Sequence, residues 1–410
     1  MTRDFWNTKV VFEIFVRNDS LEVLTNVSAS LQYRLIASVF VLSASLSGAQ
    51  NVVRVSPNFA RERPDLFTTF QVPGALGTYP MSINDSQTVA GYYTAAAGTQ
   101  GGFVRSQDGT IDTFQVPGSI LTEPVGINSA GEIVGYYEIA AGVPQGFMRT
   151  ADGQITTFAA PTVASLPTNK IAQPVAINDA GEIVGNYPDV GLASRVFVRS
   201  ATGVITTFSV SDGADYSTVA TGINAGGAIT FYGSSTSIDE AGGAIWYGQG
   251  NVPSPLLTCD CSGLALPGAT GLFPTGINAT GAVAGWFTTD ANAPYSQVTP
   301  EAPASGAFLR SPDGLITTFS SPGTLVSAHL GINASGVIFG NYTLPATPTD
   351  SHGFVRSEEG VVNSFDPDRS SSTTATGIND AGVITGYYSD ESGKVVSGFL
   401  RQPLETAAIY

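Results

Sequence analysis

Short runs that alternate apolar and polar residues recur along this chain, and small turn-forming residues separate them. The fourteen residues "PVGINSAGEIVGYY" (124–137) return as "PVAINDAGEIVGNY" (174–187) and as "ATGINDAGVITGYY" (375–388). Val, Ile, Thr, Phe and Tyr dominate these runs, as is typical of half-buried β-strands. The pattern therefore predicts strands, and it predicts the same strands several times over.

Three phrases make up the repeat. The Ile-Asn pair occurs seven times, with Asn at positions 84, 128, 178, 224, 278, 333 and 379. A second phrase, such as "GFVRS", follows each pair, and a third, "TTF" or a relative, follows most of the second phrases; "SPLL" at 254 is a degenerate third phrase. Asn, Asp and Gly between the runs favour tight hairpins, with Gln87 in place of the turn glycine in the first copy. Each copy thus predicts four short strands.

The phase of the repeat favours a ring. "LFTTF" (66–70) is a fourth strand with no first three before it, and "GFLRQP" (398–403) is a third strand with no fourth after it. We therefore predict an all-β, seven-bladed β-propeller of four-stranded blades, closed by an N-terminal strand that completes the last blade. The rival fold is an open β-solenoid, which has no use for an out-of-phase first strand.

The N-terminal residues are predicted to be a targeting segment and not part of the fold. Arg34 precedes an apolar run, and small residues at 47 and 49 suit cleavage after Ala49, so 31–49 is predicted to be a signal peptide. Residues 1–30 are then an untranslated or disordered extension, or else an amphipathic helix of the fold. Residues 50–65 form a linker, and the propeller spans 66–405.

The amino-acid composition limits the classes of partner and cofactor that the protein is expected to bind. The chain has 410 residues, 42% of them hydrophobic, and a net charge of −16. Such an acidic chain is a poor partner for nucleic acid, and no segment in the mature chain approaches the length of a membrane span. Two histidines and two cysteines do not supply a zinc site, so no metal or cofactor is expected. Cys259 and Cys261 either close a small disulfide or stay as thiols.

The motifs resemble a known repeat. "GINDAG", "IVGYY" and "GAFL", followed by "DG" and "TTF", are similar to the bacterial extracellular repeat of the HAF family, over about residues 66–405. The resemblance implies a secreted repeat protein and no particular chemistry. The namesake His-Ala-Phe triplet survives only in part, as 306–308 or 352–354, so no site residue is carried over from the family.

One end of the predicted strands carries the connections that vary in length, around 159–174, 252–274 and 288–305. Binding sites commonly occupy such loops. An aromatic residue ends the second strand of each copy toward this face: Tyr93, Tyr137, Tyr187, Tyr232, Trp286, Tyr342 and Tyr388. Either these rings bind a sugar or peptide, or they pack one blade against the next; Trp286, beside the largest insertion, is the strongest ligand-binding prediction.

An arginine series occupies one position in six copies, with Tyr247 in the other: Arg105, Arg149, Arg199, Arg310, Arg356 and Arg401. An anion-binding ring is one interpretation. The other is structural, with each guanidinium bound to carbonyls or to the turn of a neighbouring blade.

Catalytic signals are weak. His329 and His352 are the histidines available as a base, and neither lies in a recognisable motif. Asp85, Asp179 and Asp380 recur in tight turns, where capping explains them, whereas Asp239, Glu240, Asp260 and Asp290 do not recur. We therefore expect no catalytic residue and predict a secreted, non-catalytic binding module for an extracellular polysaccharide or surface protein. The alternatives are a carbohydrate-active hydrolase or lyase that uses carboxylates, and a structural envelope or matrix protein. The sequence leaves the oligomeric state open.

Overall fold

The computed structural model of the protein describes residues 13–17, 20–24 and 66–403, except for 97, 160–171, 189–192, 210–215, 236–240, 248–260, 264–265, 268 and 290–305. The chain divides into two compact units, Met1–Arg63 and Pro64–Tyr410. In the described part of the chain every regular element is a strand, so the fold is all-β.

The first unit contains one described element, an antiparallel pair of β1 (Glu13–Arg17) and β2 (Ser20–Leu24). The predicted signal peptide at 31–49 and the linker up to residue 65 lie outside the described residues. Both stay predictions.

The second unit consists of antiparallel groups of four strands, which we number I to VII. Groups I to III are β4 (Ala75–Ile83), β5 (Val89–Ala95), β6 (Gln100–Arg105) and β7 (Ile111–Phe114); β8 (Leu121–Ile127), β9 (Ile133–Glu138), β10 (Gln145–Arg149) and β11 (Ile155–Phe158); β12 (Gln173–Ile177), β13 (Ile183–Pro188), β14 (Ser194–Arg199) and β15 (Ile205–Phe208). Groups IV and V are β16 (Tyr216–Ile223), β17 (Ala228–Ser235), β18 (Ala241–Tyr247) and β19 (Cys261–Gly263); β20 (Gly271–Ile277), β21 (Val283–Thr288), β22 (Gly306–Arg310) and β23 (Ile316–Phe319). Groups VI and VII are β24 (Thr324–Ile332), β25 (Ile338–Leu344), β26 (Thr347–Arg356) and β27 (Val362–Phe365); β28 (Ser370–Ile378), β29 (Ile384–Asp390), β30 (Val396–Arg401) and β3 (Phe67–Phe70).

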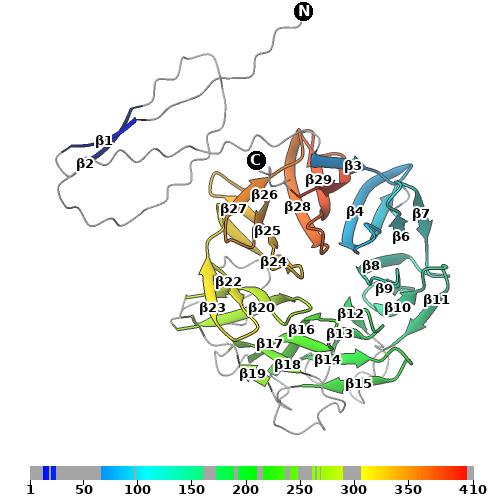
Figure 1. Cartoon of the computed structure of the whole chain (residues 1–410). Coiled ribbons are helices and arrows are strands. Elements are labelled where there is room, and N and C mark those ends of the chain that lie inside the picture. Colours follow the sequence, from blue (N-terminus) through cyan, green and yellow to red (C-terminus); the bar gives the residue numbers. More distant parts are fainter. Residues whose placement is uncertain are drawn as a thin grey trace, which may run out of the picture. The chain divides into compact units, whose positions relative to one another are not determined.

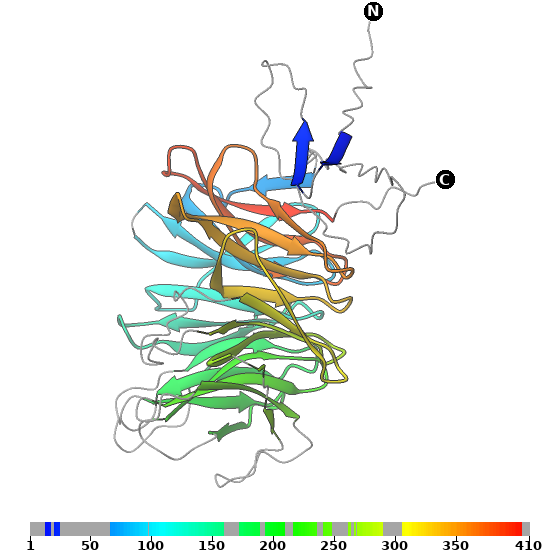
Figure 2. The same cartoon turned by 90° about the vertical axis from the view of Figure 1, so that its left-hand side faces the viewer.

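The groups are arranged in a propeller-like fold, with their first strands inside and their fourth strands outside (Figure 1). In the side view, successive sheets follow one another face to face (Figure 2). Groups III to VI are separate four-stranded sheets. Groups VII, I and II merge into one twelve-stranded sheet through single parallel bridges, Val396 to Gly77 and Gln100 to Leu121.

The N-terminal strand β3 is the outer strand of group VII. It pairs antiparallel with β30, where Phe70 lies opposite Gly398 and Thr68 opposite Leu400. The backbone N–H of Gln402 also donates to the carbonyl of Leu66, at 2.8 Å. Residues near the two ends of this unit therefore share one sheet, as the phase of the repeat predicted.

The Ile-Asn pair owes its recurrence to a buried hydrogen-bond cycle at the tight-hairpin end of the strands. In group II, Oδ1 of Asn128 accepts from the N–H of Glu132 at 2.9 Å, which closes the turn. Its Nδ2 donates to the carbonyl of Asn178 in group III at 3.2 Å. The same donation joins each asparagine to the next, and Nδ2 of Asn379 returns to the carbonyl of Asn84 at 3.1 Å.

The turn after each asparagine needs a positive φ, which glycine adopts without steric cost. Gly131 has φ 78°, and Gln87 adopts φ 55° at the same place in the first copy. Asp85, Asp179 and Asp380 cap a turn, as expected, but the turn belongs to the preceding group: Asp179 accepts from the N–H of Ser129 at 2.9 Å.

The final Phe of the "TTF" phrase packs each group against the next. Phe114 meets the fully buried Phe147 of group II edge to face, with ring centroids 6.0 Å apart. Opposite Phe147 stands Gly135, where an added Cβ would lie 2.7 Å from the ring. In group IV the large and the small residue of this cross-strand pair are exchanged between the second and third strands.

There, Phe231 on the second strand faces Ala244 on the third. Phe231 still meets Phe208 of group III at 5.7 Å, so the exchange keeps a ring in the same place. The fourth strand of group IV is β19, Cys261–Gly263, which pairs with β18. The expected strand at 254 lies outside the described residues, and the outer position is filled by this later segment.

Candidate functional site

The predicted aromatic series holds packing positions in most groups. Tyr137 is 5% exposed and donates its hydroxyl to Gln145 at 3.0 Å, and Tyr342 is 6% exposed. The ring of Tyr93 lies over Gly101, where an added Cβ would come within 2.8 Å of it. Tyr187 and Tyr388 are half-buried in core clusters. These contacts agree with the packing interpretation, and ligand binding by these residues stays a prediction.

Two members of that series belong to a different position. Trp286 pairs with Phe273 as Tyr136 pairs with Glu123, and the residue in register with Tyr137 is Phe287. Tyr232 likewise lies one residue early. Grouping these two residues with the others was wrong. They were matched to the series because they are aromatic, whereas their positions in the strand pairing differ by one residue. Trp286 is 5% exposed and stacks on Phe273 at 4.0 Å.

The arginine series also packs the groups together. Arg149 places its guanidinium 5.0 Å from the ring of Phe114 in the preceding group, and its Nη1 donates to the carbonyl of Thr150. Equivalent cation–π contacts are made by Arg105, Arg199, Arg356 and Arg401. Arg310 donates to the carbonyl of Ser311. The residue in register with Arg149 in group IV is Trp246, and not Tyr247, because Trp246 lies opposite Ile229.

One position that varies between groups is a cross-strand pair on the first and second strands. It reads Thr374–Tyr387 in group VII, Tyr79–Tyr92 in I, Glu123–Tyr136 in II, Gln173–Asn186 in III, Val219–Tyr232 in IV, Phe273–Trp286 in V and Val326–Asn341 in VI. The pairs of groups VII, I, II and III are polar or tyrosine-bearing, whereas both members of the pair in V are buried. The first strands lie on the inner side of the groups (Figure 1), and groups VII, I, II and III follow one another, so these pairs belong to neighbouring groups.

Three tyrosines of these pairs, Tyr79, Tyr92 and Tyr387, are linked by ring contacts, and Tyr136 lies beside Glu123. We call these four tyrosines, with Glu123 and Gln100, the tyrosine cluster. Tyr79 stacks on Tyr92 with centroids 4.7 Å apart, and it meets Tyr387 of group VII edge to face at 5.1 Å. Each of these rings is half-buried, as is Tyr136. The cluster therefore spans groups VII, I and II, which share the twelve-stranded sheet.

The polar centre of the cluster is Glu123. Its Oε2 accepts from Nε2 of Gln100 at 2.7 Å, and its carboxylate also accepts from the hydroxyl of Tyr136. Burial raises the pKa of Glu123 above its ordinary value, although these two hydrogen bonds oppose the shift, and nearby Glu138 raises the pKa further.

The tyrosines respond to the same burial and the same charge. Burial, followed by the negative charge of Glu123, raises the pKa of both Tyr92 and Tyr136 far above the usual range. Burial is also the main cause of the raised pKa of Tyr387. The phenols therefore stay protonated, so they can donate and accept hydrogen bonds and present uncharged ring faces.

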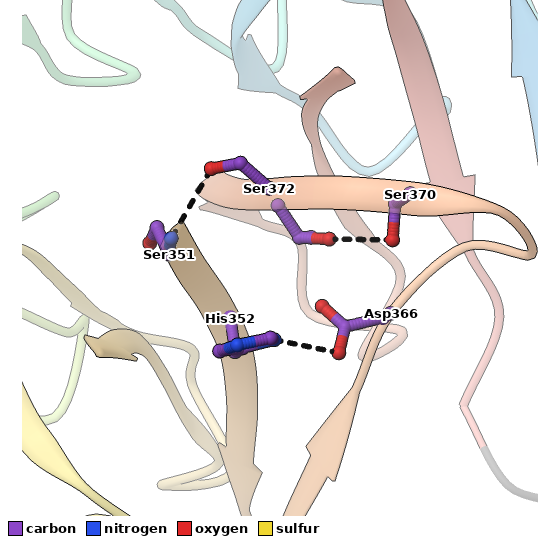
Figure 3. A network of polar contacts seen from close by, with 6 residues as sticks. Ser351, His352, Asp366, Ser370 and Ser372 are labelled. Atoms are coloured by element: carbon purple, nitrogen blue, oxygen red, sulfur yellow. Dashed lines mark hydrogen bonds and ion pairs between the residues drawn. The ribbon is translucent and has the colours of Figure 1, made fainter. Parts of the chain in front are cut away.

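A second polar network lies at the junction of groups VI and VII (Figure 3). Nδ1 of His352 is 2.9 Å from Oδ2 of Asp366, and the N–H of Ser351 donates to Oγ of Ser372 at 3.1 Å. His352 also packs on the ring of Tyr342 at 5.3 Å. His329 lies within β24, and its side chain is not among those described. The two histidines are thus on separate strands, and His352 is held by a carboxylate.

Several predicted residues lie outside the described part. These are Cys259, Asp239, Glu240, Asp260 and Asp290, together with most of the variable connections; Cys261 lies in β19, without a described side chain. Among the described residues no group of three or more His, Cys, Asp or Glu could hold a metal ion. No described helix is long and apolar enough to cross a membrane.

Sequence reasoning missed the tyrosine cluster. Tyr92, Tyr136 and Tyr387 stand directly before the tyrosines that were chosen, in the recurring "YY" of the second strand. The signal was variation: the first tyrosine of the pair is replaced by Asn186 and Asn341, which instead clamp the next group's backbone. Tyr79 and Glu123 lie on the first strand and join these residues only through pairing.

The comparisons with known proteins give distant structural similarity alone. No family model matches the chain, and no curated protein matches it. Among solved structures, the chain is similar to a prolyl endopeptidase (10% identity, TM-score 0.48, covering 84% of this chain and 50% of that one). It is also similar to an ulvan lyase (11%, TM-score 0.47, covering 82% and 96%) and to the Aleuria aurantia lectin (11%, TM-score 0.39, covering 72% and 96%). The chain thus spans about half the length of the endopeptidase.

Proposed function

We propose that this chain is a seven-bladed β-propeller of the HAF repeat type, closed by β3, and that it acts as a secreted binding module for polysaccharide. The pairing of β3 with β30 and the cycle of seven asparagine hydrogen bonds support the closed ring. The repeated "GINDAG" and "TTF" phrases support the family. Secretion rests on the signal-like residues 31–49.

The tyrosine cluster is the observation that carries the binding function. Sugar rings present apolar faces and hydroxyl edges, and tyrosine offers an apolar ring with a polar tip. Glu123 and Gln100 add a carboxylate and an amide that can fix the orientation of hydroxyl groups. The cluster sits on the one sheet that continues through three groups, so its side chains are held before a ligand arrives.

Catalysis by the residues of the tyrosine cluster is less well supported than binding. A general base works best when its pKa lies near the working pH, whereas burial raises the pKa of Tyr92 and Tyr136 far above that range. One observation favours a glycoside hydrolase as the second candidate: the pKa of Glu123 is raised, as a general acid requires, and Glu138 is near enough to contribute to that shift.

A glycan array probed with residues 50–410 tests the proposal. We expect saturable binding to at least one polysaccharide class, and Tyr92→Ala should weaken it about tenfold because a ring face is lost. Tyr247→Ala is the matched control, since Tyr247 is 41% exposed on the third strand of group IV, away from the cluster.

Two results would contradict the binding module. Release of reducing or unsaturated sugars from a bound polysaccharide, abolished by Glu123→Gln, would instead establish the hydrolase or lyase. Absence of binding to every glycan would overturn the polysaccharide ligand and leave a surface-protein ligand or a structural envelope protein as the interpretations.

A further inference from the structure

Among the described residues, the charged groups that act on Glu123 of the tyrosine cluster are negative. The described groups that act on the pKa of Glu123 are Tyr136, Gln100 and Glu138, and no lysine or arginine is among them. The arginine series lies at the tight-hairpin end, where Arg105, Arg149, Arg199, Arg310 and Arg356 each donate to the carbonyl of the next residue.

Glu123 is held as an acceptor by neutral groups. Nε2 of Gln100, 2.7 Å away, and the hydroxyl of Tyr136 each donate a hydrogen bond but bring no positive charge. A half-buried carboxylate in this situation gains most from a cation, because the cation offsets the cost of removing the charge from water. The whole chain, at −16, adds a long-range attraction for cations.

The tyrosine rings suit the same ligand. Aromatic faces attract ammonium groups through the ring quadrupole, and such rings beside a carboxylate recognise organic amines. Tyr79 stacks on Tyr92, and burial and the charge of Glu123 raise the pKa of Tyr92 and Tyr136, so the faces of these two rings stay neutral and electron-rich.

Resting on the proposed function, we infer that the tyrosine cluster selects saccharides that carry a free amine, with the ammonium group bound between Glu123 and the tyrosine faces. Neutral saccharides bind through stacking and hydroxyl hydrogen bonds without an ion pair, and uronic or sulfated saccharides are repelled by Glu123 and Glu138. The residue that sets this preference is Glu123.

The test compares one saccharide in two forms. Titration calorimetry measures the binding of a chitosan oligosaccharide, whose amines are free, and of the same oligosaccharide after full N-acetylation. We expect the amine-bearing form to bind about tenfold more tightly, since an ion pair and a cation–π contact are added. Glu123→Gln should abolish that preference, whereas Glu391→Gln, at an exposed position, should keep it.

The pH dependence gives a second readout. Binding of the amine-bearing form should weaken as the pH falls through the raised pKa of Glu123, because the carboxylate becomes neutral while the amine keeps its charge. The Glu123→Gln variant should lose this pH dependence, because it has no carboxylate to protonate.

The outcomes separate the two proposals. Equal affinity for both forms, or tighter binding of the acetylated form, overturns the amine preference and leaves the polysaccharide-binding module standing. An unchanged preference in Glu123→Gln overturns the role of Glu123. Failure of both forms to bind, with binding to other glycans on the array, overturns the inference alone, whereas binding to no glycan overturns both proposals.

Discussion

Glu123 shows how a single position departs from a repeat. In the other groups the same register holds tyrosine, glutamine, valine, phenylalanine or threonine, so nothing in the backbone requires a carboxylate there. Its half-buried carboxylate accepts hydrogen bonds from two neutral donors, and burial raises its pKa. A residue that the fold does not need, at an unfavourable place, is a candidate for ligand recognition.

Glu123→Gln should change stability in a pH-dependent way. The pKa of Glu123 is raised in the folded state, so its favourable contribution is present below the unfolded pKa and is lost as the pH rises through the folded pKa. The free energy of unfolding of the variant, relative to wild type, should therefore rise from acid to neutral pH. Urea denaturation at several pH values measures this, and Glu391→Gln, at an exposed position, is the control.

At this scale the sequence predicted the packing residues better than the site. The arginine and second-tyrosine series were visible because they recur, and recurrence reflects contacts that every group makes. The tyrosine cluster could not be predicted, because it depends on cross-strand register and on which group lies beside which. A shift of one residue moves a side chain to the opposite face, and that shift separated Trp286 and Tyr232 from the series in which they were placed.

The tight hairpin after the first strand is the element that joins one group to the next. Its asparagine closes its own turn and also reaches the next turn, so local and long-range order depend on one amide. The sequence predicted these hairpins and their strands from Asn and Gly spacing. It did not predict β19, since Cys261–Gly263 carries no "TTF" phrase, nor the exchange of Phe231 with Ala244 across two strands.

Asn128→Ala should destabilise the protein by about 1–3 kcal/mol, because buried backbone groups in two hairpins lose their partner. The lost bonds are those from Glu132 N–H at 2.9 Å and to the Asn178 carbonyl at 3.2 Å. Ser129→Ala is the matched control, because the bond of residue 129 to Asp179 uses its backbone N–H. Equal midpoints for both variants in guanidinium denaturation would contradict the structural role of the asparagine.

The largest-scale feature is the pairing of the two ends of Pro64–Tyr410. Phe67 and Phe70 of β3 contact rings of other groups: Phe67 lies 6.2 Å from Phe365 of group VI, and Phe70 lies 6.2 Å from Phe103 of group I. The out-of-phase strand was the decisive sequence signal, because a fourth strand without a first has to find its partners elsewhere.

Deletion of residues 66–70 should lower the free energy of unfolding by at least about 3 kcal/mol, since two packed aromatic side chains and one strand are lost. Thermal melting followed by circular dichroism measures the change. Deletion of residues 1–49 is the control and should leave the melting temperature unaltered, because those residues belong to the other compact unit. A 66–70 deletion that melts like the parent protein would favour the open solenoid.

The pairing of β3 with β30 also affects how the protein folds during synthesis. The amide of Asn379 bonds the carbonyl of Asn84 across 295 residues of chain, a separation that slows folding. While the ribosome is still making the C-terminal strands, β3 has no partner, and the exposed edge of the nascent sheet invites aggregation. A product truncated before β30 therefore leaves β3 unpaired, and it should aggregate more readily than the full-length polypeptide.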